Sequence, residues 1–147
     1  MGTRRKAREL AMQALFYMDI RNDLSVEMLA HFCGNFNPSP KALPFFLKLV
    51  NGVLETRGEL DALIERFSKN WEINRMSCVD RNVMRIAVFE LVYCDDIPPK
   101  VSINEAVDIG KKFGTEESGA FINGIMDSIR SDLEKKGTLK KVDERKD

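Results

Sequence analysis

The first eight residues of this chain carry four basic side chains and no acidic one, a grouping suited to binding an anion. Arg4, Arg5, Lys6 and Arg8 fall in the first turns of an expected helix, where the helix dipole favours negative charge. The cluster therefore destabilises the helix unless an anion lies nearby. Because backbone N–H groups at a helix start also bind phosphate, these residues predict a phosphate contact. The alternative is a solvated first turn whose charges only aid solubility.

The histidine and cysteine content argues against a histidine-based metal site, a catalytic triad or a zinc framework. The chain has one histidine and three widely spaced cysteines, which is typical of a cytoplasmic protein with reduced thiols. Asp95 and Asp96 could serve a metal or an acid–base site, but they precede a proline turn, and a helix exit explains them better. We therefore expect a protein without enzyme activity, metal or cofactor.

Charge is balanced overall but unevenly distributed. The 147 residues include 23 basic and 23 acidic side chains, yet residues 9–134 hold 13 bases against 20 acids. A basic N-terminus on an otherwise acidic chain is a localised positive patch of the kind that binds a polyanion. Basic ends can also serve solubility alone. No stretch approaches the roughly 20 apolar residues of a membrane span, and the start MGTRRKAREL lacks the apolar core of a secretory signal. We expect a globular cytoplasmic protein.

The segments that position these residues follow a helical period. In the first segment, apolar side chains recur at intervals of three and four and bury one stripe. Gly58 indicates a break or a kink between two later segments. The pattern predicts an all-α domain over residues 1–134, in two packed bundles at about 1–72 and 76–134, with a disordered basic tail at 135–147. The about seven expected helices are residues 3–20, 25–33, 40–56, 59–68, 79–94, 102–113 and 116–133.

The run from Val79 to Cys94 is the most apolar part of the chain, with 11 of its 16 residues apolar. A buried strand is an alternative for part of it, but the whole run is too long for an ordinary strand. A helix that is apolar on nearly every side must be surrounded by other helices, so we expect this one at the centre. Ser77 and Asp80 resemble a capping box at its start, as Ser102 and Glu105 do further on.

Phe121 lies off the buried stripe of the last predicted helix, among the small residues Gly119, Ala120 and Gly124. An aromatic ring with open space around it can present its face to a nucleic-acid base. Packing against a neighbouring helix is an equal alternative. Trp71, by contrast, is expected to close the end of the first bundle as a core residue.

A more specific signal comes from four segments in fixed order: RRKARELAMQALF, VDRNVMRIAVFEL, IPPKVSINEAVDIGKKFG and EESGAFINGIMD. Through them the chain resembles the NusB family of bacterial transcription antitermination factors over nearly its whole length. The resemblance implies an all-helical fold of two subdomains and no catalysis. It also implies binding to boxA RNA of ribosomal RNA leader transcripts together with ribosomal protein NusE. The resulting antitermination complex helps RNA polymerase to pass terminators.

The resemblance also implies which residues make contacts. At the arginine-rich start, Arg4, Arg5 and Arg8 would lie beside the RNA, with Gln13 further along the helix as a weaker candidate. The other candidates for RNA contact are Asn74, Arg75, Glu117 and Phe121. The candidates for contact with NusE, at the head of the central helix, are Asp80 and its neighbours Arg81 and Arg85.

Together these residues predict one compact RNA site. The first-turn arginines would neutralise phosphates of a short single strand while Phe121, close to them, stacks on a base and Glu117 accepts from base amino groups. A helical protein-binding module that ignores RNA is the main alternative. NusB-like domains are also fused to RNA cytosine methyltransferases, but the chain has no glycine-rich cofactor loop. A homodimer could form where NusE would dock, so the oligomeric state stays open.

Overall fold

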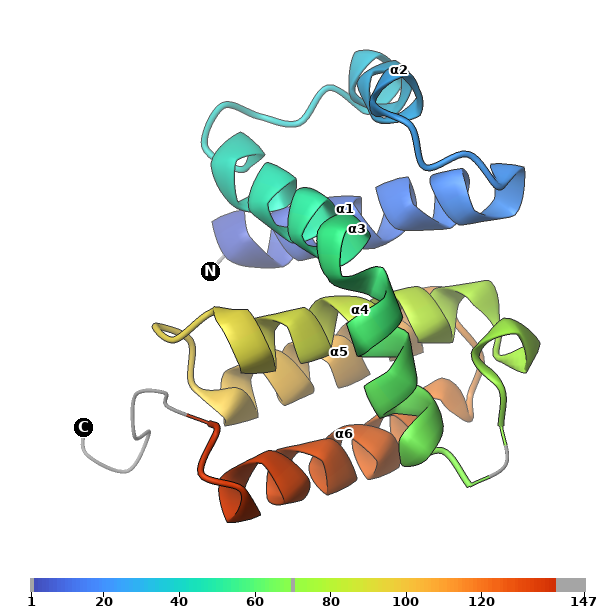
Figure 1. The fold of residues 1–147 in the computed structure, drawn as a ribbon. Helices are drawn as coiled ribbons and strands as arrows, with labels where there is room; N and C mark the ends of the chain where they lie inside the picture. The colour runs from blue at the N-terminus through green and yellow to red at the C-terminus, as the bar shows by residue number, and fades with distance from the viewer. Residues whose placement is uncertain (1, 70, 140–147) are drawn as a thin grey trace.

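The computed structural model of the chain describes residues 2–69 and 71–139. These residues form six α-helices and one short 3-10 helix and contain no β-strand, which confirms the predicted all-α class (Figure 1). The helices are α1 (Thr3–Arg21), α2 (Val26–Phe36), α3 (Leu43–Arg66), η1 (Ile73–Arg75), α4 (Cys78–Tyr93), α5 (Pro99–Phe113) and α6 (Ser118–Lys135).

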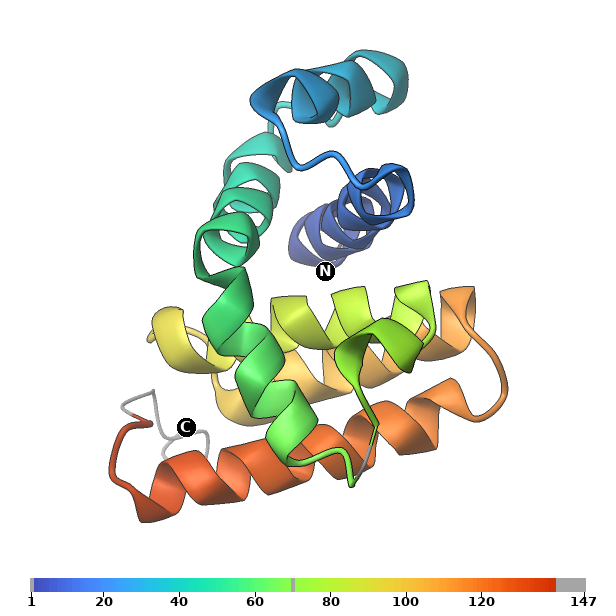
Figure 2. The same ribbon diagram turned by 45° about the vertical axis from the view of Figure 1, so that its right-hand side comes forward.

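The helix α4 forms the centre of the fold, as its apolar sequence predicts. Eleven of its 16 residues are buried, and it packs against α1, α3, α5 and α6. In Figures 1 and 2, α4 lies between α1 on one side and α6 on the other, with α5 beside it. Its start has the predicted cap, because the Ser77 hydroxyl oxygen accepts a hydrogen bond from the Asp80 N–H at 3.1 Å.

The helix α3 replaces two of the seven predicted helices. The sequence predicts a break or a kink at Gly58; the helix continues through this residue and is kinked two residues earlier, at Thr56, where φ is −116° and ψ is 17°. The Thr56 hydroxyl donates to the Gly52 carbonyl oxygen at 2.7 Å, a local bond that bends helices. Exposed glycine is tolerated in a helix at a modest cost, so Gly58 alone does not end it.

The start of α5 differs from the predicted capping box at Ser102 and Glu105. The helix begins three residues earlier, at Pro99, a residue whose missing N–H costs nothing at the first helical position. Ser102 and Glu105 therefore lie inside α5 rather than at its end. Both side chains are used for long-range contacts instead, with Glu90 and with Arg5 respectively.

The helix α6 extends to Lys135, two residues beyond the predicted end at Leu133. Gly137 has a positive φ of 69°, which allows the Thr138 N–H to donate to the Leu133 carbonyl oxygen at 3.1 Å. Leu139 then packs against the core. Of the predicted disordered tail, residues 140–147 lie outside the described residues.

The helix α3 contacts both groups of helices. Figure 2 shows it running past α1 and α4 and ending beside α6. The predicted division into bundles at 1–72 and 76–134 stays a prediction. Within the described part of the chain, no helix has both the length and the apolar character needed to cross a membrane.

Two glycines of α3 should respond in opposite directions to the same substitution. A Cβ at Gly52 would collide with the ring of Phe89, which is buried, whereas a Cβ at Gly58 meets nothing within 4 Å. We expect Gly52→Ala to lower the free energy of unfolding by about 1–3 kcal/mol through overpacking. Gly58→Ala should raise it by up to about 1 kcal/mol, because alanine favours the helix. Urea unfolding of both variants measures the two effects, and equal changes would contradict this packing.

Candidate nucleic-acid interface

The first turn of α1 lies over the connection between α4 and α5, where carboxylates surround it. Arg4 pairs with Asp96 at 3.1 Å, and Arg5 donates to Glu105 at 2.8 Å and to Asp108 at 3.0 Å. The hydrogen bond from Arg5 lowers the pKa of Glu105, and the hydrogen bond from Arg4 lowers that of Asp96. The anions that offset the cationic helix start are therefore side chains of the chain itself.

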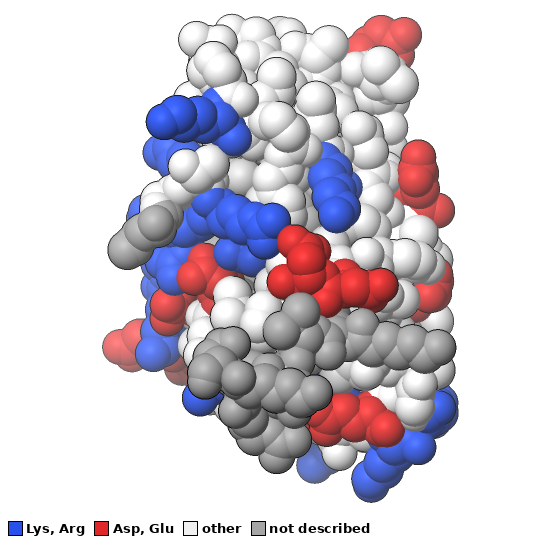
Figure 3. Space-filling view, turned by 90° about the vertical axis from the view of Figure 1, so that its left-hand side faces the viewer, with Lys and Arg blue, Asp and Glu red and all other residues white. Residues whose placement is uncertain are grey.

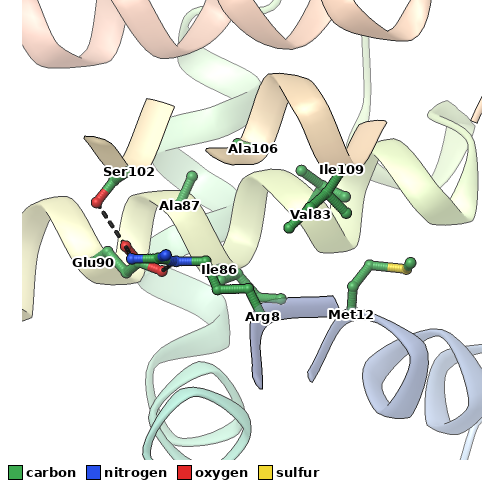
Figure 4. Close-up of a pocket in the computed structure, with 9 residues that line it drawn as sticks. All are labelled: Arg8, Met12, Val83, Ile86, Ala87, Glu90, Ser102, Ala106 and Ile109. Atoms are coloured by element: carbon green, nitrogen blue, oxygen red, sulfur yellow. Dashed lines mark hydrogen bonds and ion pairs between the residues drawn. The ribbon is translucent and has the colours of Figure 1, made fainter. Parts of the chain in front are cut away.

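Arg8 is buried, with only 4% of its surface exposed. Its guanidinium donates to both oxygens of Glu90, at 2.7 and 3.0 Å, and the Ser102 hydroxyl donates to the same carboxylate at 2.6 Å. Figure 4 shows Arg8 and Ser102 pointing toward Glu90 from two different helices. This arrangement ties α1 to α4 and α5. An RNA contact by Arg8 stays a prediction and would require the guanidinium to leave Glu90.

The exposed parts of Arg4 and Arg5 line a surface hollow of about 450 Å³. The Arg4 side chain is 52% exposed and that of Arg5 is 37% exposed, so both remain accessible to an anion. Asp96 and Glu105 line the same hollow. Figure 3 shows the end of the molecule where α1 begins, with basic and acidic side chains directly beside one another. The hollow is thus a mixed surface in which a phosphate would compete with carboxylates.

Gln13 lies in a different setting, on the wall of an apolar hollow of about 310 Å³. Phe16 and Phe36, which also line it, are 36% and 51% exposed. The sequence analysis did not identify this hollow. The available signal was that Phe16 and Tyr17 fall off the buried stripe of α1. The other lining residues are Met12, Tyr17, Phe32, Val79 and Phe113.

Phe121 and the first-turn arginines form separate groups, so the expectation of one compact site is wrong. The Phe121 ring packs edge-to-face against Trp71, with ring centroids 6.1 Å apart. Trp71 precedes the start of α4, whereas Asp96, the partner of Arg4, follows its end. A helix of this length spans roughly 24 Å, which sets the separation. Glu117 is the N-cap residue of α6, four residues before Phe121. It accepts a hydrogen bond from the Thr115 hydroxyl at 3.2 Å.

Asn74 and Arg75 lie in η1, shortly after Trp71 in the chain. The Arg75 side chain is 77% exposed, and its ion pair with Glu72 is long, at 4.0 Å. The Asn74 carbonyl oxygen accepts from Arg81 at 3.4 Å, which ties the loop to α4. These two candidates therefore belong with Phe121 rather than with the arginines of α1.

The three candidates for NusE contact are largely turned inward. Arg85 is 2% exposed and donates to Asp61 at 2.7 Å and to Asp19 at 3.1 Å. Arg81 donates to Asp19 at 2.8 Å. Asp80 is 8% exposed, and one of its carboxylate oxygens has no hydrogen-bond partner among the described residues. Their roles toward a partner stay predictions, and Arg81 and Arg85 are already bound to carboxylates.

Asp19 is the centre of this charged cluster between α1 and α4. Burial acts to raise the pKa of its carboxyl group, but hydrogen bonds from Arg81 and Asn82 and the charge of Arg85 outweigh burial and lower the pKa to about 2. The carboxylate therefore stays ionised in the folded chain at any ordinary pH.

The comparisons with known proteins agree with this fold. A model of the NusB family matches residues 5–131. The chain belongs to the NusB family. This NusB-family chain is 54% identical over 141 residues to the transcription antitermination protein NusB of Desulfatibacillum aliphaticivorans, a match that covers 96% of the chain and 99% of that protein.

Solved NusB structures resemble the chain throughout. T. maritima NusB is similar with a TM-score of 0.79 and 39% identity, over 87% of this chain and 90% of that one. A complex of the antitermination factors NusB and NusE with double-stranded RNA matches with a TM-score of 0.80 and 28% identity. That match covers 90% of this chain and 98% of the other. The resemblance to the NusB family is thereby confirmed, while the individual contact residues stay predictions.

Replacement of Arg8 should destabilise this NusB-family fold far more than replacement of Arg4. Arg8→Ala leaves the Glu90 carboxylate buried without its partner, and breaking such a pair costs about 3–5 kcal/mol. Arg4→Ala removes an exposed pair, which is worth about 1 kcal/mol or less. Urea unfolding at neutral pH measures both. Similar losses for the two variants would show that the Arg8–Glu90 pair is not buried as described.

The stability of the chain should depend on Asp19 in acid. Because the pKa of its carboxyl group is about 2 in the folded chain and 3.8 when the group is free in the unfolded chain, its contribution is complete above about pH 4 and is lost as the pH falls toward 2. The contribution amounts to about 2 kcal/mol. Asp19→Asn should therefore be less stable than wild type at pH 5, and the difference should shrink by pH 2. Urea unfolding across this range tests the prediction, and a difference that does not change with pH would contradict it.

Proposed function

We propose that the chain is a cytoplasmic transcription antitermination factor that binds boxA RNA of ribosomal RNA leader transcripts together with ribosomal protein NusE. The proposal rests chiefly on the match of the NusB family model to residues 5–131, which include every candidate contact except Arg4. The similar NusB chain that was solved with NusE and double-stranded RNA supports the same partners. The activity is binding, and it requires no catalytic step.

Arg4 and Arg5 neutralise phosphates by exchanging charge partners. The pair between Arg4 and Asp96 is exposed on both sides, and such pairs contribute little free energy, so a phosphate can replace the carboxylate at low cost. Arg5 binds two carboxylates, those of Glu105 and Asp108. They hold its guanidinium in place while part of the side chain stays exposed. Each phosphate contact with single-stranded RNA contributes about −0.7 to the logarithmic salt slope. Two contacts therefore give a slope of about −1.4.

Phe121 and Glu117 supply contacts with bases at the start of α6. The Phe121 ring is half-buried, so one part of it remains accessible while Trp71 supports its orientation. Stacking of an unpaired base on such a ring tolerates any base. Glu117 accepts from base amino groups, which adds a preference among bases.

NusE docks at the apolar hollow between α1, α2, α4 and α5. Its rim includes Phe16 and Phe36, which are exposed aromatic residues of the kind that anchor protein interfaces. Val79 of the same hollow precedes Asp80, the family's candidate for NusE contact. Joint binding of RNA by both proteins raises affinity through effective concentration. The complex then acts on RNA polymerase, and a second copy of the chain is the competing occupant of the hollow.

The double variant Arg4→Ala/Arg5→Ala should weaken binding to single-stranded boxA RNA and reduce the steepness of its salt dependence by about 1.4, because two phosphate contacts are lost. Fluorescence anisotropy of labelled RNA across a salt series measures both quantities. Arg21→Ala is the matched control, since it removes an exposed arginine from the other end of α1. Circular dichroism should show intact helices in all variants.

Two results would contradict this proposal. Unchanged affinity in the double variant would show that the arginines are not the phosphate site. Absence of RNA binding by the wild type at low salt, alone and with NusE, would favour a protein-binding module instead.

A further inference from the structure

Trp71 is an exposed ring on a fixed backbone. The sequence analysis expects it in the core, but 49% of its surface is exposed. The Ser68 hydroxyl donates to its carbonyl oxygen at 2.7 Å, and the Glu65 carboxylate accepts from the Ile73 N–H at 2.7 Å. These bonds tie the chain at and just after the tryptophan to Ser68 and to the last turn of α3. The ring is therefore held in place without being covered.

Trp71 and Phe121 form a pair of rings with differently oriented faces. Their centroids are 6.1 Å apart and their planes meet at 73°, although the residues are fifty positions apart in the sequence. Such an edge-to-face pair is itself favourable, so each ring fixes the orientation of the other. The indole keeps accessible surface beyond this contact.

One cationic side chain belongs to the loop of Trp71, and a second contacts α6 at Gly119, a position that faces away from Phe121. Arg75 follows Trp71 in the same loop, and its side chain is 77% exposed. Lys111 of α5 lies across the first turn of α6, because a Cβ at Gly119 would come within 2.9 Å of its Cε. The acidic neighbours are Glu72, at 4.0 Å from Arg75, and Glu117. Aromatic faces accompanied by cations are the combination that binds single-stranded nucleic acid.

We propose that Trp71 is a second base-stacking residue, which together with Phe121 holds consecutive unpaired bases of a single-stranded RNA. Arg75, which follows Trp71 in the same loop, contacts a phosphate beside these bases. The inference rests on the proposed RNA-binding function and extends its site to a residue outside the candidate contacts. A protein would be the other occupant of an exposed tryptophan, but the apolar hollow beside Phe16 offers a protein a larger apolar surface elsewhere.

The intrinsic fluorescence of the chain tests this proposal directly, because Trp71 is its only tryptophan. Wild-type protein is titrated with unlabelled single-stranded boxA RNA while tryptophan emission is recorded, and binding is measured separately by anisotropy of labelled RNA. A base stacked on the indole should quench its emission and protect it from acrylamide. The quenching curve should follow the anisotropy curve.

Variants at position 71 give an independent measurement. Trp71→Ala and Trp71→Leu should weaken RNA binding about fivefold to a hundredfold, the range for one lost stacking contact. Trp71→Phe keeps an aromatic face and should lose much less. Val26→Ala, which removes an exposed apolar side chain from the start of α2, should bind RNA like wild type. Circular dichroism checks that each variant is folded.

The outcomes separate this inference from the proposed function. RNA binding without quenching, and with unchanged affinity in Trp71→Ala, would overturn the role of Trp71 and leave the RNA-binding function intact. Quenching by NusE but not by RNA would identify a protein as the occupant and would also overturn it. No RNA binding by anisotropy would overturn both.

Discussion

The buried ion pair between Arg8 and Glu90 determines where the first turn of α1 lies. Both oxygens of the carboxylate accept from the guanidinium, and Ser102 adds a third hydrogen bond, so helices α1, α4 and α5 meet at one group. A bidentate pair fixes direction as well as distance. Buried pairs of this kind add little net stability compared with apolar packing, but they do not tolerate the loss of one member. The positions of Arg4 and Arg5 on the surface follow from this constraint.

The same end of α1 shows how a folded chain can carry a cationic helix start. Asp96, Glu105 and Asp108 offset the unfavourable interaction between the arginines and the helix dipole. The offset has a consequence for binding, because a phosphate gains only the difference between its own attraction and that of the carboxylate it replaces. A polyanion still has an advantage over a single anion, since its binding releases condensed counterions. For the proposed RNA contact, the mixed surface would therefore favour a polyanion over small phosphates.

Features set by neighbouring residues could be predicted from the sequence. The Ser77 cap and the extent of α1 depend on residues within a few turns, and the burial of α4 follows from the apolar composition of its own sequence. The partner of Arg8 lies 82 residues away, so no local pattern reveals that Arg8 is buried. For the same reason, Ser102 and Glu105 resemble a cap when their real partners, in α4 and α1, are unknown. The exposure of Trp71 could not be predicted for the same reason, because the residues that could cover its ring lie far away in the sequence, in α6.

The separation of the two contact groups constrains how one RNA strand can bind. The Arg4 group and the Trp71–Phe121 group flank opposite ends of α4, a helix whose 16 residues span roughly 24 Å. At about 3.4 Å per nucleotide in a stacked strand, a connecting segment needs roughly seven nucleotides. A shorter strand would reach only one group, and its affinity would reflect only that group. Because loop closure between two weak sites is less costly than a second independent binding event, a strand long enough to span α4 gains from both. In the proposed binding mode, the length of α4 thereby governs how long a stacked RNA strand must be to reach both groups.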